Sequence, residues 1–165
     1  TLIVSSVEVF IHLILDQPVG TIKRINIITH GNGSRIAFSG EIDKEGNVHF
    51  DEELDIETLR GMLSIGIEYR GKHVEWEQVE LRFAKDAEIV VFACKAAVSE
   101  TLLRDVANFF DVTVKGFTTE LHYHITFTEA KSIVHRNEIT VDGDKDLNEL
   151  NPTVVKEPEL KNPFE

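Results

Sequence analysis

The chain has 165 residues, of which 42% are hydrophobic and 28% charged, and this composition is typical of one soluble globular domain. Seventeen basic residues stand against 29 acidic ones, and the formal net charge of −12 argues against nonspecific binding to nucleic acid or to anionic membranes. No apolar run approaches the roughly 20 residues that span a bilayer, and the single cysteine excludes an internal disulfide and favours a reducing, cytoplasmic compartment.

The first half of the chain predicts a helix, a buried strand, a hairpin and a second helix. Apolar residues recur at helical spacing after Ser5 and Ser6, either of which can cap the helix. The nearly continuous β-branched run that ends at Thr29 predicts a strand covered on both faces. Asp55 is the expected cap of the second helix. The expected ranges are 5–16 and 55–64 for the helices, 22–29 for the buried strand, and 35–40 with 47–50 for the hairpin.

The second half predicts a further buried strand, a helix and a third strand. Residues 65–85 fit either a strand or a helix, and we favour a helix that ends near Phe83. The run 88–93 predicts the second buried strand, Ser99 caps a helix that continues to Phe110, and 112–117 predicts the third strand. Short strands over 123–128 and 132–141 predict a second hairpin.

These elements predict an α/β fold with a mainly parallel sheet. A strand, a helix and a strand joined by short links form a parallel βαβ unit. We expect residues 1–142 to form one domain. Residues 143–165 are acidic and punctuated by Pro152, Pro158 and Pro163, which predicts an extended or disordered tail.

Two buried strands deliver side chains suited to nucleophilic thiol chemistry. His30 follows the first strand and Cys94 follows the second. Ligands of open parallel sheets bind beyond the carboxyl ends of the strands. A thiol is mostly protonated at neutral pH, so a neighbouring imidazole is its usual activator. Gly31 lets a backbone N–H approach a substrate carbonyl as an oxyanion donor.

The two strand ends resemble the caspase–gingipain group of cysteine peptidases. The matching pieces are a buried strand that ends in His30-Gly31 and a second that ends in Ala93-Cys94 and is followed by a helix. The resemblance covers residues 22–117. Caspases proper carry Gln-Ala-Cys-x-Gly, whereas this chain has Phe92 before Ala93-Cys94, so the resemblance is to more distant members.

The resemblance implies a three-layer α/β/α caspase-like fold and a cysteine endopeptidase. It implies Cys94 as the nucleophile, His30 as the general base and the Gly31 amide in the oxyanion hole. No cofactor is expected, and the partner is a protein or peptide substrate. From the topology we expect the segment after the third strand to line the substrate pocket, with Thr118, Thr119 and His122 as substrate-binding residues.

Two other interpretations stay open. The first is a catalytically inactive domain of the same fold that serves as a scaffold or interaction module inside a larger protein. The second is a metal-dependent hydrolase, because alternation along a strand puts His122 and His124 on one face. A third ligand would come from a carboxylate or from one of the other histidines, His12, His49, His73 and His135. We favour the peptidase, which needs no metal.

Overall fold

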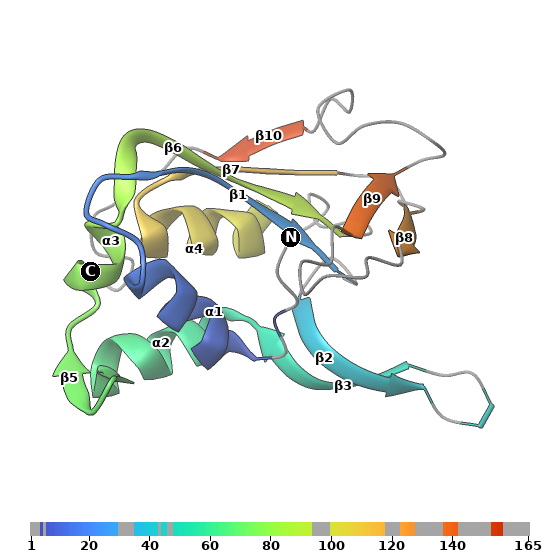
Figure 1. Ribbon diagram of the computed structural model, residues 1–165, viewed down its shortest axis with the longest axis horizontal. Coiled ribbons are helices and arrows are strands. Elements are labelled where there is room, and N and C mark those ends of the chain that lie inside the picture. The colour runs from blue at the N-terminus through green and yellow to red at the C-terminus, as the bar shows by residue number, and fades with distance from the viewer. Residues whose placement is uncertain are drawn as a thin grey trace.

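The centre of the fold is a four-stranded sheet with the strand order β1-β6-β7-β10 (Figure 1). The computed structural model describes residues 4, 6–29, 35–42, 44–45, 48–93, 100–117, 123–127, 137–141 and 153–156. β1 (Ile22–Ile28), β6 (Phe83–Phe92) and β7 (Thr113–Gly116) run parallel to one another. The predicted α/β class with a mainly parallel sheet is therefore confirmed.

The helices of the described residues lie on one side of this sheet (Figure 1). They are α1 (Val7–Leu15), α2 (Ile56–Ile65), α3 (Glu77–Glu80) and α4 (Glu100–Phe110). All four bury apolar side chains in one core together with residues from one face of the sheet. The aromatic centre of this core is the fully buried Phe110 ring, which contacts the rings of Phe10, Trp76 and Phe83 at centroid distances of 6.2, 5.3 and 5.8 Å.

Two helices begin at the caps that the sequence predicts. The Ser6 hydroxyl accepts the backbone N–H of Val9 at 3.0 Å. The Asp55 carboxylate accepts the backbone N–H of Thr58 at 2.9 Å. Each cap satisfies a donor that has no partner inside the helix. The buried face of α1 is also as predicted and consists of Val7, Phe10, Ile11, Ile14 and Leu15.

The last residues of β6 are buried on both faces of the sheet. Ile89 and Val91 belong to the core shared with the helices, and Val90 and Phe92 alternate with them. All four are fully buried, which confirms the prediction of a strand covered on both faces. A second layer of helices, as in a three-layer α/β/α fold, stays a prediction because the helices in the described part of the chain all belong to the first layer.

Two of the antiparallel hairpins that accompany the sheet are predicted from the sequence. β2 (Ile36–Ile42) pairs with β3 (Val48–Leu54), and this hairpin extends away from the body of the molecule (Figure 1). β8 (Tyr123–Phe127) pairs with β9 (Asn137–Val141). The first hairpin is longer than predicted, since β3 continues directly to the cap of α2.

The prediction of a helix that ends near Phe83 is wrong. β4 (Ile67–Tyr69) and β5 (Lys72–Val74) form a small hairpin, α3 is a single turn, and Phe83 opens β6. The backbone after α3 leaves the helix because it pairs with the residues before β1. The Gly20 N–H donates to the Leu81 carbonyl at 2.8 Å, and the Thr21 N–H donates to the Arg82 carbonyl at 3.1 Å.

Part of the segment predicted as an extended tail belongs to the main sheet. β10 (Thr153–Lys156) pairs antiparallel with β7, with Thr153 opposite Gly116 and Lys156 opposite Val114. Extended backbone is compatible with this pairing, and β10 covers the edge of β7 that β6 does not occupy. The ordered sheet therefore includes residues from beyond the predicted domain boundary at 142.

Candidate functional site

The carboxyl ends of three parallel strands meet at one edge of the sheet. Ile28 at the end of β1 is the register partner of Phe92 at the end of β6. Val91 of β6 is the register partner of Gly116 at the end of β7. The chain therefore leaves these three neighbouring strands at nearly the same level. In open parallel sheets this edge is where ligands bind.

Contacts continue past the ends of the strands. The backbone N–H of Thr29 donates to the Phe92 carbonyl at 3.2 Å, which extends the pairing of β1 and β6 by one residue. The rings of Phe92 and Phe117 lie 5.4 Å apart, which joins the ends of β6 and β7. Phe92 and Ala93 are fully buried, and Phe117 is nearly so. The described part of this edge is thus a tightly packed apolar base.

The residues predicted to carry the chemistry all lie outside the described residues. This holds for His30, Gly31 and Cys94, and also for Thr118, Thr119 and His122. The structure describes the residues immediately before three of these segments, namely Thr29, Ala93 and Phe117. Those three residues directly follow the adjacent strands β1, β6 and β7. The contact between His30 and Cys94 stays a prediction.

Thr29 connects the end of β1 to β2 as well as to β6. Its hydroxyl donates a hydrogen bond to the Ala37 carbonyl near the start of β2, and this contact is partly buried. The loop of residues 30–34 begins directly after Thr29. The bond between Thr29 and Ala37 therefore ties the two strands that flank this loop.

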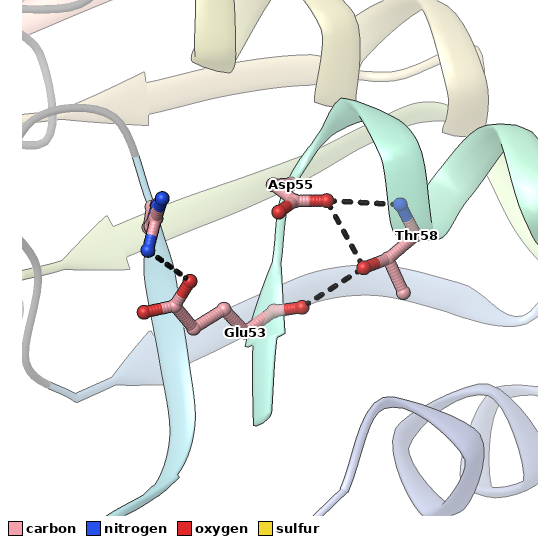
Figure 2. Close-up of polar contacts among 4 residues, drawn as sticks. Glu53, Asp55 and Thr58 are labelled. Atoms are coloured by element: carbon pink, nitrogen blue, oxygen red, sulfur yellow. Dashed lines mark hydrogen bonds and ion pairs between the residues drawn. The ribbon is translucent and has the colours of Figure 1, made fainter. Parts of the chain in front are cut away.

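A second anchor holds the other end of the same loop. Arg35, the first described residue after it, forms an ion pair with the Glu53 carboxylate at 2.9 Å. Figure 2 shows how Glu53 is joined to the start of α2: its carbonyl lies 3.2 Å from the Thr58 hydroxyl. That hydroxyl and the Thr58 N–H both lie within 3.0 Å of the Asp55 carboxylate. The loop end is thereby connected to a capped helix of the core.

On the sheet face opposite the helices, the side chains change from charged to apolar along β6. Near its middle, the Glu88 carboxylate contacts the guanidinium of Arg24 on β1 at 3.2 Å and the ammonium of Lys115 on β7. These charges are partly buried, and the single carboxylate pairs with both cations. Toward the carboxyl end the face becomes apolar with Val90 and Phe92. The described base of the candidate site therefore contains no charged side chain of its own.

The histidines considered as metal ligands have other partners where they are described. The His12 imidazole lies 2.8 Å from the Glu68 carbonyl, and His73 lies between the carboxylates of Glu68 and Glu75 at 3.4 and 3.3 Å. His12 lies on α1, and His73 lies on β5. No group of three or more metal-ligating side chains occurs within the described residues. His122 and His135 lie outside the described residues, and the side chains of His49 and His124 are not described.

Within the described part of the chain, three ionisable groups have shifted pKa values: Asp16 at the end of α1, Tyr69 on β4 and Asp105 on α4. The hydrogen bond from the Tyr69 hydroxyl lowers the pKa of Asp16, with Arg70 acting in the same direction, and it raises the pKa of Tyr69. Burial raises the pKa of Asp105 on α4, and the positive charges of Arg60 and Arg104 only partly offset it. These shifts are properties of the scaffold around the site.

Comparisons with known proteins add no family to this description, since no family model, no curated protein and no solved structure matches the chain. Within the described residues, none of the helices has the length and apolarity needed to cross a membrane.

Sequence reasoning missed the residues that anchor the site, Thr29, Arg35 and Glu53. A threonine at the end of a strand is ordinary, and nothing in the sequence links it to Ala37 eight residues later. The ion pair of Arg35 and Glu53 had a weak signal, because opposite charges at the two ends of a predicted hairpin often pair across strands. A hairpin predicted to end at Phe50 leaves Glu53 outside it and therefore does not reveal this pair.

Proposed function

We propose that this chain is a caspase-like cysteine peptidase domain. One observation supports the proposal most. The strands that precede His30 and Cys94 are parallel neighbours, and each of these residues comes two positions after a member of the register pair Ile28–Phe92. Two segments that continue from such a pair start side by side at the edge where ligands of parallel sheets bind. The His-Gly and Ala-Cys pattern supplies the chemistry.

In the proposed reaction Cys94 is the nucleophile and His30 moves the proton. The Cys94 thiol gives its proton to His30, and its sulfur forms a bond to the carbonyl carbon of the scissile peptide. The carbon–nitrogen bond then breaks, and His30 returns the proton to the leaving amine. Water hydrolyses the resulting thioester, which frees the carboxylic acid and restores the thiol. The Gly31 N–H stabilises the oxyanion in both steps.

The segment after β7 supplies the substrate pocket in this proposal. β7 is the neighbour of β6, so the last described residues before the two segments, Phe117 and Ala93, follow adjacent strands. Thr118, Thr119 and His122 belong to that segment. The substrate is an extended peptide, and no metal or organic cofactor takes part.

The proposal is tested by cleavage of a peptide library followed by mass spectrometry. The wild-type chain is expected to cleave a subset of the peptides, and Cys94→Ala and His30→Ala are each expected to abolish cleavage. His73→Ala is the matched control, because His73 lies at the β4–β5 hairpin among its own carboxylates. Cleavage that survives Cys94→Ala, or a wild-type chain that cleaves nothing, would contradict the proposal and favour the non-catalytic scaffold.

A further inference from the structure

β1 is the first strand of the main sheet, and within the described residues the order β1-β6-β7-β10 gives it a neighbour on one side only. The Thr29 N–H, which directly follows β1, donates to the Phe92 carbonyl of β6. In a parallel ladder the residues that bond to one neighbour recur at every second position. Ile27 and Ile25 therefore direct their backbone N–H and C=O groups toward β6, as Thr29 does.

Arg24 and Asn26 occupy the alternate positions, so their backbone N–H and C=O groups point away from β6. Both residues are exposed, and no strand of the described residues pairs with this side of β1, which we call the outer edge of β1. A row of open donors and acceptors is a template for one more strand. An extended peptide that is added there forms main-chain hydrogen bonds to β1, which is a recurring mode of peptide recognition.

The charges of β1 favour one kind of incoming strand. Lys23 and Arg24 are adjacent and exposed, and β1 contains no acidic residue although the chain has 29 acidic and 17 basic residues. Both cations lie where the register of β1 on β6 shifts, between Ile22 and Arg24. A lysine and an irregularity on an edge strand disfavour pairing with a second copy of the same edge. Acidic side chains on an incoming strand are instead paired with these cations.

We propose that the outer edge of β1 is a docking surface for an extended acidic peptide segment, which is added to the sheet as a further strand. The backbone groups of Arg24 and Asn26 supply the hydrogen bonds. The Arg24 side chain is already held by the Glu88 carboxylate at 3.2 Å and by the Asn26 amide oxygen at 2.9 Å, so Lys23 supplies most of the charge preference. This surface runs along β1 and does not depend on the proposed peptidase activity.

The first measurement is amide hydrogen exchange, followed by NMR in the free protein at two concentrations. The amides of Arg24 and Asn26 should exchange at least about tenfold faster than those of Ile25 and Ile27, because only the latter pair bonds to β6. Slow exchange of Arg24 and Asn26 at both concentrations would show that the chain itself covers this edge. Slow exchange at the high concentration alone would show that a second copy occupies it, and either result overturns the proposal.

The second measurement is fluorescence anisotropy with a fluorescein-labelled peptide of alternating glutamate and valine, and a lysine–valine peptide is its matched control. The acidic peptide should bind at least about fivefold more tightly and should slow the exchange of the Arg24 and Asn26 amides. This preference is a stringent test, because the net charge of −12 favours the basic peptide where no specific site exists. No binding, equal binding of the two peptides, or binding that leaves these amides unprotected would contradict the proposal.

Variants of β1 locate the bound strand. Asn26→Pro removes the outward N–H and leaves the bonds to β6 in place, so it should weaken binding of the acidic peptide by at least about tenfold. Asn26→Ala keeps that N–H and should stay within about twofold of the wild type.

The charge is tested separately, and this pair of variants decides if Asn26→Pro does not fold. Lys23→Glu should weaken binding of the acidic peptide by about fivefold. Lys85→Glu, at an exposed position of the neighbouring strand β6, is its control and should have a smaller effect. If a folded Asn26→Pro, or Lys23→Glu, binds the peptide as the wild type does, the peptide is not an added strand at the outer edge of β1 and the proposal fails.

Discussion

Ile28 and Phe92 are register partners at the ends of adjacent parallel strands, and the peptide N–H that follows Ile28 donates to the Phe92 carbonyl. This pairing brings the ends of β1 and β6 to one level although 63 residues separate Thr29 from Phe92. It is the structural basis for expecting His30 and Cys94 to act together.

Phe92 is expected to be essential for the stability of this edge. It is fully buried on the face opposite the helices and packs on Phe117 with centroids 5.4 Å apart. Phe92→Ala should lower the free energy of unfolding by about 3–5 kcal/mol, because it removes a large buried side chain and leaves a cavity. Chemical denaturation measures the loss. Val19→Ala, at a side chain that is 59% exposed, is the control and should change it by less than about 0.5 kcal/mol.

The cap of α2 is expected to stabilise the anchor of the loop end. Asp55→Ala removes the acceptor for the Thr58 N–H and should cost about 1 kcal/mol in urea denaturation. Asp55→Asn keeps a side-chain oxygen at the cap and should recover most of that loss. If the alanine and asparagine variants were equally stable, the hydrogen bond at the cap would not be the source of the effect.

Tyr69 is expected to control the ionisation of Asp16. Tyr69→Phe removes the hydrogen bond that is the largest cause of the lowered pKa of Asp16, so this pKa should rise toward its ordinary value. The stabilising contribution of a carboxylate with a lowered pKa is present at neutral pH and is lost as the pH falls through that value. An NMR titration of the Asp16 carboxyl measures the change. An unchanged Asp16 titration in Tyr69→Phe would refute the assignment to this hydrogen bond.

The pKa of Asp105 is shifted in the opposite direction from that of Asp16. Burial raises its pKa, so the folded state binds a proton more readily than the unfolded state, and stability falls as the pH rises through the ordinary and then the raised pKa. Asp105→Asn should therefore raise the melting temperature at pH 7, and the gain should shrink as the pH approaches about 4. Asp86→Asn, at an exposed position of β6, is the control. A lower melting temperature for Asp105→Asn at pH 7 would show that the attraction of Arg60 and Arg104 outweighs burial.

Elements with a strong local pattern could be predicted from the sequence. The apolar spacing of α1, the cap Asp55 and the continuous run of β6 each report burial directly, and each matches the structure. The β4–β5 hairpin could not be predicted this way. Its turn has positive φ angles at Arg70 and Gly71, 51° and 73°, and arginine gives no signal of that conformation.

The other features that the sequence did not predict depend on tertiary contacts. The spacing of Trp76, Val79 and Phe83 suggests one helix face, yet Phe83 reaches the same core from a strand because the backbone turns to pair with the residues before β1. β10 is short and lies in an acidic segment, so only its pairing with β7 distinguishes it from a tail. For the site, the sequence could predict the strands that precede His30 and Cys94. The hydroxyl bond of Thr29 could not be predicted, because it depends on the position of a neighbouring strand.

The most direct test of the central claim is the rate of Cys94 alkylation by iodoacetamide from pH 5 to 9, measured by mass spectrometry in the wild type, His30→Ala and the control His73→Ala. A thiolate activated by His30 should react rapidly below pH 7 in the wild type and in His73→Ala, and this reactivity should collapse in His30→Ala. Slow alkylation that follows an ordinary thiol titration and is the same in all three proteins would contradict the peptidase proposal.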